Sequence, residues 1–175
     1  LRAVLEMTSL SSEDIALIEI HGTGTALGDP TEVGALVAVH GTEERTLALA
    51  VGTVKASSGH SEAASGQFGI MAAQGALAKV QASGNARLYS LNPVVREHIN
   101  AGCAWMMLPV HTSNSQVLAA ASVSSFGYSG TIAHAALRHT PIVADAEERT
   151  PAHTYRRRAF PWREPSHPFA QRRLP

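Results

Sequence analysis

The sequence predicts an α/β domain. Three apolar runs suited to buried strands, 15–20 (IALIEI), 46–51 (TLALAV) and 117–125 (VLAAASVSS), are each followed by a glycine-rich loop. Helix-compatible segments lie between the strands, and such alternation is typical of a mainly parallel sheet covered by helices. Functional sites in these folds collect at the carboxyl ends of the strands, so we expect the three loops to form the site.

The first helices are predicted from their termini. Residues 1–10 read as the end of a helix already under way, because no capping residue precedes its apolar positions, and this indicates a piece of a longer chain. After the first strand, Asp29-Pro30-Thr31-Glu32 places an acceptor at the N-cap, proline at the first helical position and glutamate at the third. A helix is therefore expected to start at Asp29 and to stop near Gly41.

The second half of the chain contains one long helix candidate. Residues 62–81 are helix-compatible and small on every face, which predicts a helix buried all round whose glycines allow other backbones to approach closely. Short strands are expected within 87–93 (RLYSLNP) and 103–110 (CAWMMLPV). From about residue 140 the composition becomes rich in proline and arginine, which predicts a domain over 1–139 and a linker over 140–175.

Composition narrows the classes of function. Charged residues make up 16% of the chain against about 25% on average, so much of the surface is expected to be covered by other protein. The formal net charge of zero gives no electrostatic basis for a nucleic-acid or membrane-surface partner. The one cysteine cannot form an internal disulfide, and neither a signal-peptide pattern nor an apolar run of roughly 20 residues is present. We expect a reducing, cytoplasmic compartment and no membrane span.

Three other site motifs have weak support. HGTGTALG spaces its glycines one residue too widely for a dinucleotide fingerprint, and FGYSGT matches a nucleophile elbow only loosely. The nine histidines lack metal-ligand spacing, so no metal site is expected. The histidines that we interpret as ordinary surface or core residues are His40, His98, His111, His139, His153 and His167.

His21 and His60 differ from the other histidines. Each follows a predicted strand and lies in a loop of small residues. Two neutral imidazoles aimed at one point can donate two N–H bonds to a developing oxyanion, and each such donor is worth about 3 to 4 kcal/mol. Lys55 can pair with an acid and hold these hydrogen bonds in register, with Glu62 and Glu32 as the candidates. The residues alone leave open an active site and a satisfied structural cluster.

Three stretches carry a resemblance to a known family. IEIHGTGTALGDPTEVGAL, GTVKASSGHSEAASG and SVSSFGYSGTIAHAAL resemble, in order and spacing, the C-terminal signature blocks of β-ketoacyl synthases, specifically the ketosynthase domains of type I modular polyketide synthases. The resemblance covers residues 1–137. It implies a thiolase-like fold, in which two α/β halves pack into five layers, with this chain forming most of the second half.

The resemblance also implies roles for individual residues. It gives catalytic roles to His21, His60, Lys55 and Glu62. Thr23 and Thr25 fall where the family holds the phosphopantetheine arm. Phe126 and Gly127 fall on the loop whose backbone amide helps to form the oxyanion hole and whose aromatic ring gates the acyl pocket.

The implied reaction is a decarboxylative Claisen condensation in polyketide or fatty-acid synthesis, between an acyl chain and a malonyl-type extender on acyl carrier protein. The family's nucleophilic cysteine belongs to an upstream block that is absent here, and Cys103 is interpreted as a structural cysteine on a strand. The implied partners are acyl carrier protein, the N-terminal half and a second copy of the full domain. No cofactor is expected on this chain, because phosphopantetheine carries the substrate. The alternative is a non-catalytic ketosynthase-like scaffold or chain-length partner.

Two departures from the family pattern lie beside the site. The family's Ser-Asn-Ile becomes Ala56-Ser57-Ser58, and an asparagine of the third block becomes Ile132. Neither change touches a proton-carrying residue, so a divergent active enzyme is favoured. The tail YRRRAFPWREPSHPF resembles the linker that follows a ketosynthase, with Phe160, Trp162 and Phe169 as docking anchors.

Overall fold

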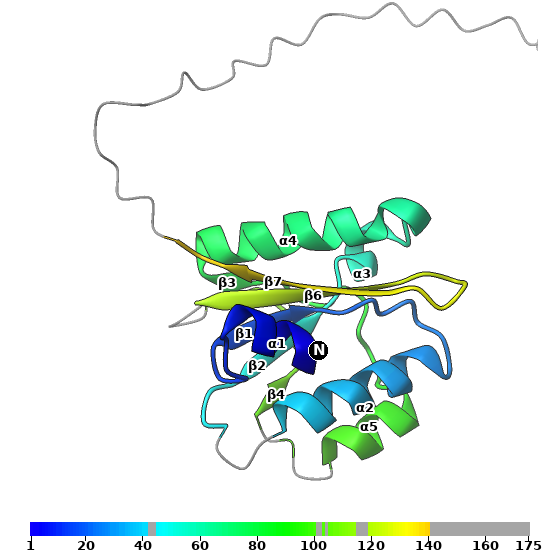
Figure 1. The fold of residues 1–175 in the computed structure, drawn as a ribbon. Coiled ribbons are helices and arrows are strands. Elements are labelled where there is room, and N and C mark those ends of the chain that lie inside the picture. Colours follow the sequence, from blue (N-terminus) through cyan, green and yellow to red (C-terminus); the bar gives the residue numbers. More distant parts are fainter. Residues whose placement is uncertain (42–44, 101–102, 104, 115–118, 141–175) are drawn as a thin grey trace, which may run out of the picture. The chain divides into compact units, whose positions relative to one another are not determined.

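A five-stranded sheet organises the chain in the computed structural model (Figure 1). Its strand order is β4-β2-β1-β6-β7, and the strands are β1 Ile15–Glu19, β2 Leu49–Gly52, β4 Met106–Met107, β6 Ala120–Phe126 and β7 Ile132–Arg138. The first four strands of this order are parallel, and β7 runs antiparallel to β6. The predicted α/β class with a mainly parallel sheet is confirmed.

The structure describes residues 1–41, 45–100, 103, 105–114 and 119–140. These belong to one unit, Leu1–Thr140. The predicted linker beyond residue 140, with Phe160, Trp162 and Phe169, lies outside the described residues, and so does the start of the strand expected over 117–125.

Helices cover both faces of the sheet (Figure 1). Helix α4 (Ser65–Lys79) lies on one face, and α1 (Arg2–Thr8), α2 (Gly28–His40) and α5 (Pro93–Asn100) lie on the other. Two short turns, α3 (Lys55–Ser58) and a 3-10 helix (Glu62–Ala64), lead into α4, and β3 (Gln81–Ala82) pairs with β5 (Ser113–Asn114). Among these helices, none is long and apolar enough to cross a membrane.

Two apolar clusters separate these layers. Ile15 and Ile18 of β1 pack with Leu36 and Val95 on the side of α2 and α5. Leu17 packs with Ala73 on the side of α4. Residues of β1 belong to both clusters, so this strand is buried toward both faces of the sheet. Such double burial explains why this strand reads as a continuous apolar run.

Helix α2 forms where it was predicted, but its start differs. The helix begins at Gly28 after Leu27, and Asp29 lies in its first turn without a capping bond. The Asp29 carboxylate accepts instead from the backbone N–H of Gly24, 3.1 Å away. The expected N-cap was therefore wrong, because the acceptor is used to close the preceding loop.

Helix α4 is buried on one face only, so the prediction of burial all round is wrong for this chain. Its buried residues are Ser65, Gly69, Ala73, Ala76 and Leu77. Phe68 is 43% and Met71 66% exposed. A Cβ at Gly69 would lie 2.9 Å from Val123 Cγ1, whereas one at Gly75 would meet nothing within 4 Å. Only the first of these glycines is required by a close approach, and that approach is by a side chain rather than a backbone.

Residues 87–93 contain no strand, so that prediction was wrong. Helix α5 follows instead, beginning with Pro93, and the Asn92 side chain accepts from the N–H of Val94 at 2.9 Å. Asparagine before proline is an N-cap signal, and it outweighs the short apolar run. Strand β4 confirms the expectation within 103–110, although Cys103 lies before it and outside any strand.

Candidate active site

The three glycine-rich loops meet at one edge of the sheet, as predicted. Strands β1, β2 and β6 are parallel neighbours, so their carboxyl ends lie together and bring His21, His60 and Phe126 to one place. The rings of His21 and His60 are edge to face with centroids 5.6 Å apart. The Phe126 ring lies 5.2 Å from His21. Residues more than 100 positions apart therefore form one cluster.

Glu32 fixes the backbone at His21. This buried carboxylate accepts from the N–H of His21 at 2.8 Å and from the N–H of Gly22 at 2.9 Å. Gly22 has a φ of 42°, a left-handed conformation that glycine adopts without strain. The loop after β1 is thus tied to α2 by the glutamate that the capping pattern had assigned to the helix terminus.

The surroundings of His21 favour its neutral imidazole. Burial lowers its pKa, and the nearby charges of Lys55 and His60 lower it further. Its Nδ1 is buried and has no hydrogen-bond partner among the described residues. A neutral ring has one N–H donor and one acceptor nitrogen, so it can still donate one hydrogen bond to an oxygen.

Two buried acids surround Lys55. Burial lowers the lysine pKa, and the charges of Glu19 and Glu32 oppose that effect. Burial also raises the pKa of Glu19 to about 7, and Glu19 accepts a short hydrogen bond from the N–H of Val54 at 2.5 Å. The expected pairing of Lys55 with Glu32 fits this arrangement. Glu62 instead begins the 3-10 helix as an exposed residue with a φ of 48°.

Sequence reasoning missed Glu19. It lies in the apolar run of β1, directly before Ile20 and His21, and its side chain packs beside Gly69 of α4. A carboxylate inside an otherwise apolar strand was the available signal, because such a residue is seldom buried without a partner.

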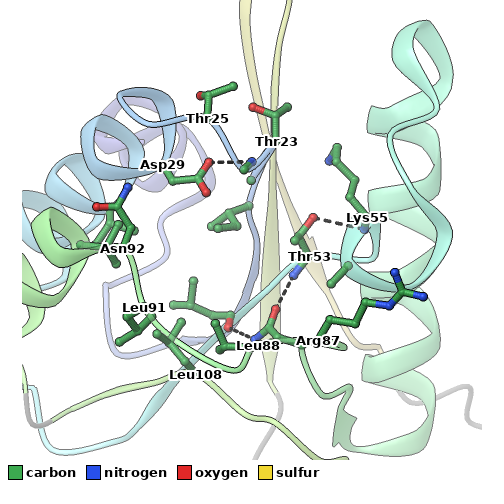
Figure 2. Close-up of a pocket in the computed structure, with 18 of the residues that line it drawn as sticks. Thr23, Thr25, Asp29, Thr53, Lys55, Arg87, Leu88, Leu91, Asn92 and Leu108 are labelled. Atoms are coloured by element: carbon green, nitrogen blue, oxygen red, sulfur yellow. Dashed lines mark hydrogen bonds between the residues drawn. The ribbon is translucent and has the colours of Figure 1, made fainter.

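A cavity of about 470 Å³ opens beside the histidine cluster. Its walls include Thr23, Thr25, Lys55 and His60. Figure 2 shows the two threonines, Asp29 and Lys55 at one end of the cavity, and Leu88, Leu91 and Leu108 at the other. A volume of this size suits a small organic ligand, with polar groups at one end to orient it.

The loop after β6 is a hairpin turn into β7. The Gly127 N–H donates to the carbonyl of Thr131 at 2.7 Å, and Phe126 pairs with Ile132 in the ladder. Ile132 is therefore accommodated within a regular hairpin. The Gly127 amide, expected to help form an oxyanion hole, is already engaged in this turn, and Tyr128 at the tip is fully exposed.

Cys103 lies away from the cluster. Its thiol is buried in the α2 and α5 layer, lies 3.5 Å from the carbonyl of His98, and has its pKa raised by burial. A buried thiol of raised pKa is a poor nucleophile, which fits the structural interpretation. Among the described residues, no group of three His, Cys, Asp or Glu side chains is arranged to hold a metal ion.

Comparison with known proteins now decides the family. Residues 1–87 match the C-terminal domain of β-ketoacyl synthases. The chain is 38% identical over 146 residues, 81% of its length, to the highly reducing polyketide synthase azaB of Aspergillus niger. It is 34% identical over 153 residues, 83% of its length, to the erythronolide synthase EryA2 of Saccharopolyspora erythraea. The chain belongs to the β-ketoacyl synthase family.

Solved ketosynthases have the same fold. The ketosynthase from module 1 of the bacillaene synthase of Bacillus amyloliquefaciens matches 80% of this chain with a TM-score of 0.72 and 30% identity. The oxazolomycin ketosynthase domain of Streptomyces albus matches 78% with a TM-score of 0.70 and 28% identity. The fold is therefore thiolase-like, as the signature blocks implied.

The ketosynthase chain covers a small part of these proteins. It spans 6% of azaB, 4% of EryA2, 26% of the bacillaene ketosynthase and 24% of the oxazolomycin ketosynthase. Activity, substrates and partners of a whole enzyme are accordingly matters for proposal.

Proposed function

We propose that this chain forms the C-terminal half of a ketosynthase that catalyses decarboxylative Claisen condensation in polyketide or fatty-acid biosynthesis. The observation that supports it most is the edge-to-face pair of His21 and His60, 5.6 Å apart at the carboxyl ends of neighbouring strands. Two imidazoles at this spacing can donate to one oxygen that lies between them. The sequence signature blocks supply the reaction class.

The reaction begins with a malonyl-type thioester. Its carboxylate leaves as CO2, and the electron pair of the broken C–C bond moves into the thioester as an enolate. His21 and His60 each donate an N–H bond to the enolate oxygen. The enolate carbon then attacks the carbonyl of an acyl chain held on a cysteine in the N-terminal half, and that cysteine leaves as a thiolate. Cys103 takes no part, because its thiol is buried in the apolar cluster of α2 and α5 and burial raises its pKa.

The cavity is assigned to the carrier arm of the substrate. Thr23 and Thr25 present hydroxyls at its polar end, beside Lys55. These groups suit the amides and hydroxyl of phosphopantetheine, and acyl carrier protein delivers that arm. The positive charge of Lys55 offsets the negative charges of Glu19 and Glu32 and adds to the effect of burial in lowering the pKa of His21. Glu62, at the start of the 3-10 helix that follows His60, keeps the catalytic role that the resemblance implies.

The remaining partners follow from exposed surfaces. The N-terminal half is assigned to the uncovered face of α4, where Phe68 and Met71 are exposed. The oxyanion role is assigned to the loop of Phe126 and Gly127, as the resemblance implies, because the Phe126 ring lies 5.2 Å from His21. A homodimer of the full domain, a linker over 140–175 and a cytoplasmic location complete the proposal.

The test uses a ketosynthase that contains this chain together with an N-terminal half. We expect His60→Ala to lower CO2 release from malonyl thioester by roughly 10²- to 10³-fold, the loss typical of one oxyanion donor. Acyl loading on the nucleophilic cysteine should be retained, because that step precedes decarboxylation. His139→Ala is the matched control, since His139 is exposed and follows β7 at the opposite edge of the sheet.

Release of CO2 by His60→Ala at the wild-type rate would remove the role given to His60. A wild-type protein that neither loads an acyl chain nor releases CO2 would favour the non-catalytic scaffold.

A further inference from the structure

Asn85 lies at a junction that the proposed reaction does not explain. This half-buried residue follows β3 and lines the cavity. Its backbone N–H donates to the carbonyl of Pro109 at 2.7 Å. The residue therefore connects the segment after β3 to the segment after β4, and its side chain remains free to reach a third segment.

That third segment is the turn Gly52–Lys55, which we call the lysine turn. The Asn85 Oδ1 accepts from the N–H of Thr53 at 3.1 Å. The Asn85 Nδ2 donates to the carbonyls of Val51 and Pro109 at 3.0 and 3.2 Å. The amide oxygen accepts one hydrogen bond and the amide nitrogen donates two. A carboxylate has no donor and an apolar side chain has neither group, so neither can replace the amide.

The lysine turn passes this constraint on to Lys55. The Thr53 hydroxyl accepts from the N–H of Lys55 at 3.3 Å (Figure 2). Thr53 therefore bonds Asn85 through its own N–H and Lys55 through its hydroxyl. Gly52 fits closely against the amide, because a Cβ there would lie 3.3 Å from Asn85 Oδ1 and 3.6 Å from its Nδ2.

We propose that Asn85 is a positioning residue for Lys55, which it holds at the cavity through Thr53 and the lysine turn. Its importance for catalysis rests on the proposed function of Lys55, whereas the positioning itself can be measured without any reaction. The groups near Lys55 are Glu19, Glu32 and His21, whose pKa values respond to the ammonium charge, and His60, which lines the same cavity.

The chain offers an internal reference for the measurement. It contains two lysines, Lys55 and the exposed Lys79 at the end of α4. We would acetylate the 175-residue chain with a trace of acetic anhydride across a pH series and compare the two lysines by peptide mass spectrometry. The midpoint of Lys55 labelling should lie below that of an ordinary lysine, because burial lowers its pKa.

Asn85→Ala and Asn85→Asp should both move the Lys55 midpoint upward, since a released turn admits water to the ammonium. Asn85→Asp should have the larger effect, because a carboxylate would repel the carbonyls of Val51 and Pro109 and attract the ammonium. The control is Asn114→Ala, which removes an exposed amide that bonds Gln81 in the small β3–β5 sheet. Gly52→Ala, whose Cβ would press on the Asn85 amide, should cause a smaller shift and preserves the test if the Asn85 variants do not fold.

In the ketosynthase, Asn85→Ala should lower kcat for decarboxylation about tenfold, a transition-state loss of about 1.4 kcal/mol, with little change in KM. An unchanged Lys55 midpoint in folded Asn85→Ala and Asn85→Asp, or an equal change in Asn114→Ala, would overturn the positioning role. A shifted midpoint with unchanged kcat would leave Asn85 as the positioning residue and would instead remove the catalytic role proposed for Lys55.

Discussion

Glu32 and Glu19 are buried acids that act through backbone amides. Glu32 accepts from the N–H groups of His21 and Gly22, and Glu19 accepts from the N–H of Val54. Each carboxylate therefore fixes the turn that carries a proposed catalytic residue, His21 in one case and Lys55 in the other. At the scale of single residues, the site depends on buried carboxylates that bond to the backbone of its loops.

Replacing Glu32 by glutamine should destabilise the chain. The amide can accept from one of the two N–H groups, but its NH2 then faces the other donor, and an unpaired buried donor costs about 1–3 kcal/mol. Urea unfolding should show a loss of this size for Glu32→Gln and a negligible one for Glu97→Gln, which lies exposed on α5. An equal loss of stability in both variants would contradict the structural role of the two hydrogen bonds that Glu32 accepts.

The stability that Glu19 contributes should decrease as the pH rises. The folded chain keeps the Glu19 proton up to a pKa of about 7, whereas the unfolded chain releases it near the ordinary value of 4.5. The folded state thus binds more protons between these values, and the contribution present below pH 4.5 is lost as the pH approaches 7. At about 1.4 kcal/mol per pKa unit, the loss is roughly 3 kcal/mol at most.

Glu19→Gln isolates this effect from other titrating groups. The difference in unfolding free energy between wild type and Glu19→Gln should change steadily between pH 4.5 and 7 and be flat outside that window. A difference that does not depend on pH would show that Glu19 is ionised throughout.

Sequence reasoning predicted which candidate residues lie close together better than it predicted their contacts. His21, Lys55 and His60 were expected to lie together because each lies in a glycine-rich loop after a strand, and parallel strands bring such loops together. Thr23 was expected at the site only from the family resemblance. The hydrogen bonds of Glu32 and the burial of Glu19 could not be predicted, because the partners of a buried acid depend on which donors the whole fold brings near it. Local spacing predicted that Glu32 caps its own helix. In the structure it accepts instead from the backbone N–H groups of His21 and Gly22.

At the scale of elements, α4 packs on the sheet through Gly69. A Cβ at this position would lie 2.9 Å from Val123 Cγ1 and 3.2 Å from Glu19 Cγ. Alanine raises helix propensity by about 1 kcal/mol over glycine, but overpacking a core costs about 1–3 kcal/mol. The close contact requires the helix to move or Val123 to change rotamer.

Gly69→Ala should therefore be less stable than Gly75→Ala by about 1–3 kcal/mol, because Gly75 has open space around its Cα. Thermal and urea unfolding of the two variants provide the comparison, and helix propensity cancels between them. If Gly69→Ala is as stable as Gly75→Ala, α4 does not lie as close to β6 as the structure places it.

Sequence reasoning missed strand β7, which is defined by its partner more than by its own pattern. Strand β7 forms because it pairs along its whole length with β6, from Ile132 opposite Phe126 to Arg138 opposite Ala120. None of its residues is fully buried, and His134 interrupts its apolar residues. The strands β1 and β2 were predicted well because both are buried on two faces and read as apolar.

At the scale of the whole molecule, one face of α4 lacks a covering layer within the described residues. Phe68 and Met71 lie on this face, and contiguous exposed apolar surface marks an interaction site. Phe68→Glu combined with Met71→Glu should raise the solubility of the 175-residue chain and leave its unfolding free energy nearly unchanged.

The same pair of substitutions should strongly reduce the yield of folded ketosynthase when an N-terminal half is present, because two charges would be buried between the halves. Static light scattering of the isolated chain and size-exclusion chromatography of the ketosynthase measure the two effects. Normal assembly of the doubly substituted ketosynthase would place the N-terminal half elsewhere.

The order of the strands has a consequence for synthesis on the ribosome. Strand β1 lies between β2 and β6, yet β6 follows β1 by roughly 100 residues of chain. At about 5–20 residues per second, one edge of β1 waits about 5–20 s for its neighbour. An unpaired, apolar strand edge readily pairs with another chain, so nascent copies are vulnerable to aggregation until β6 emerges. Slow translation after β2 would lengthen that interval, and the His21–Phe126 contact can form only when it ends.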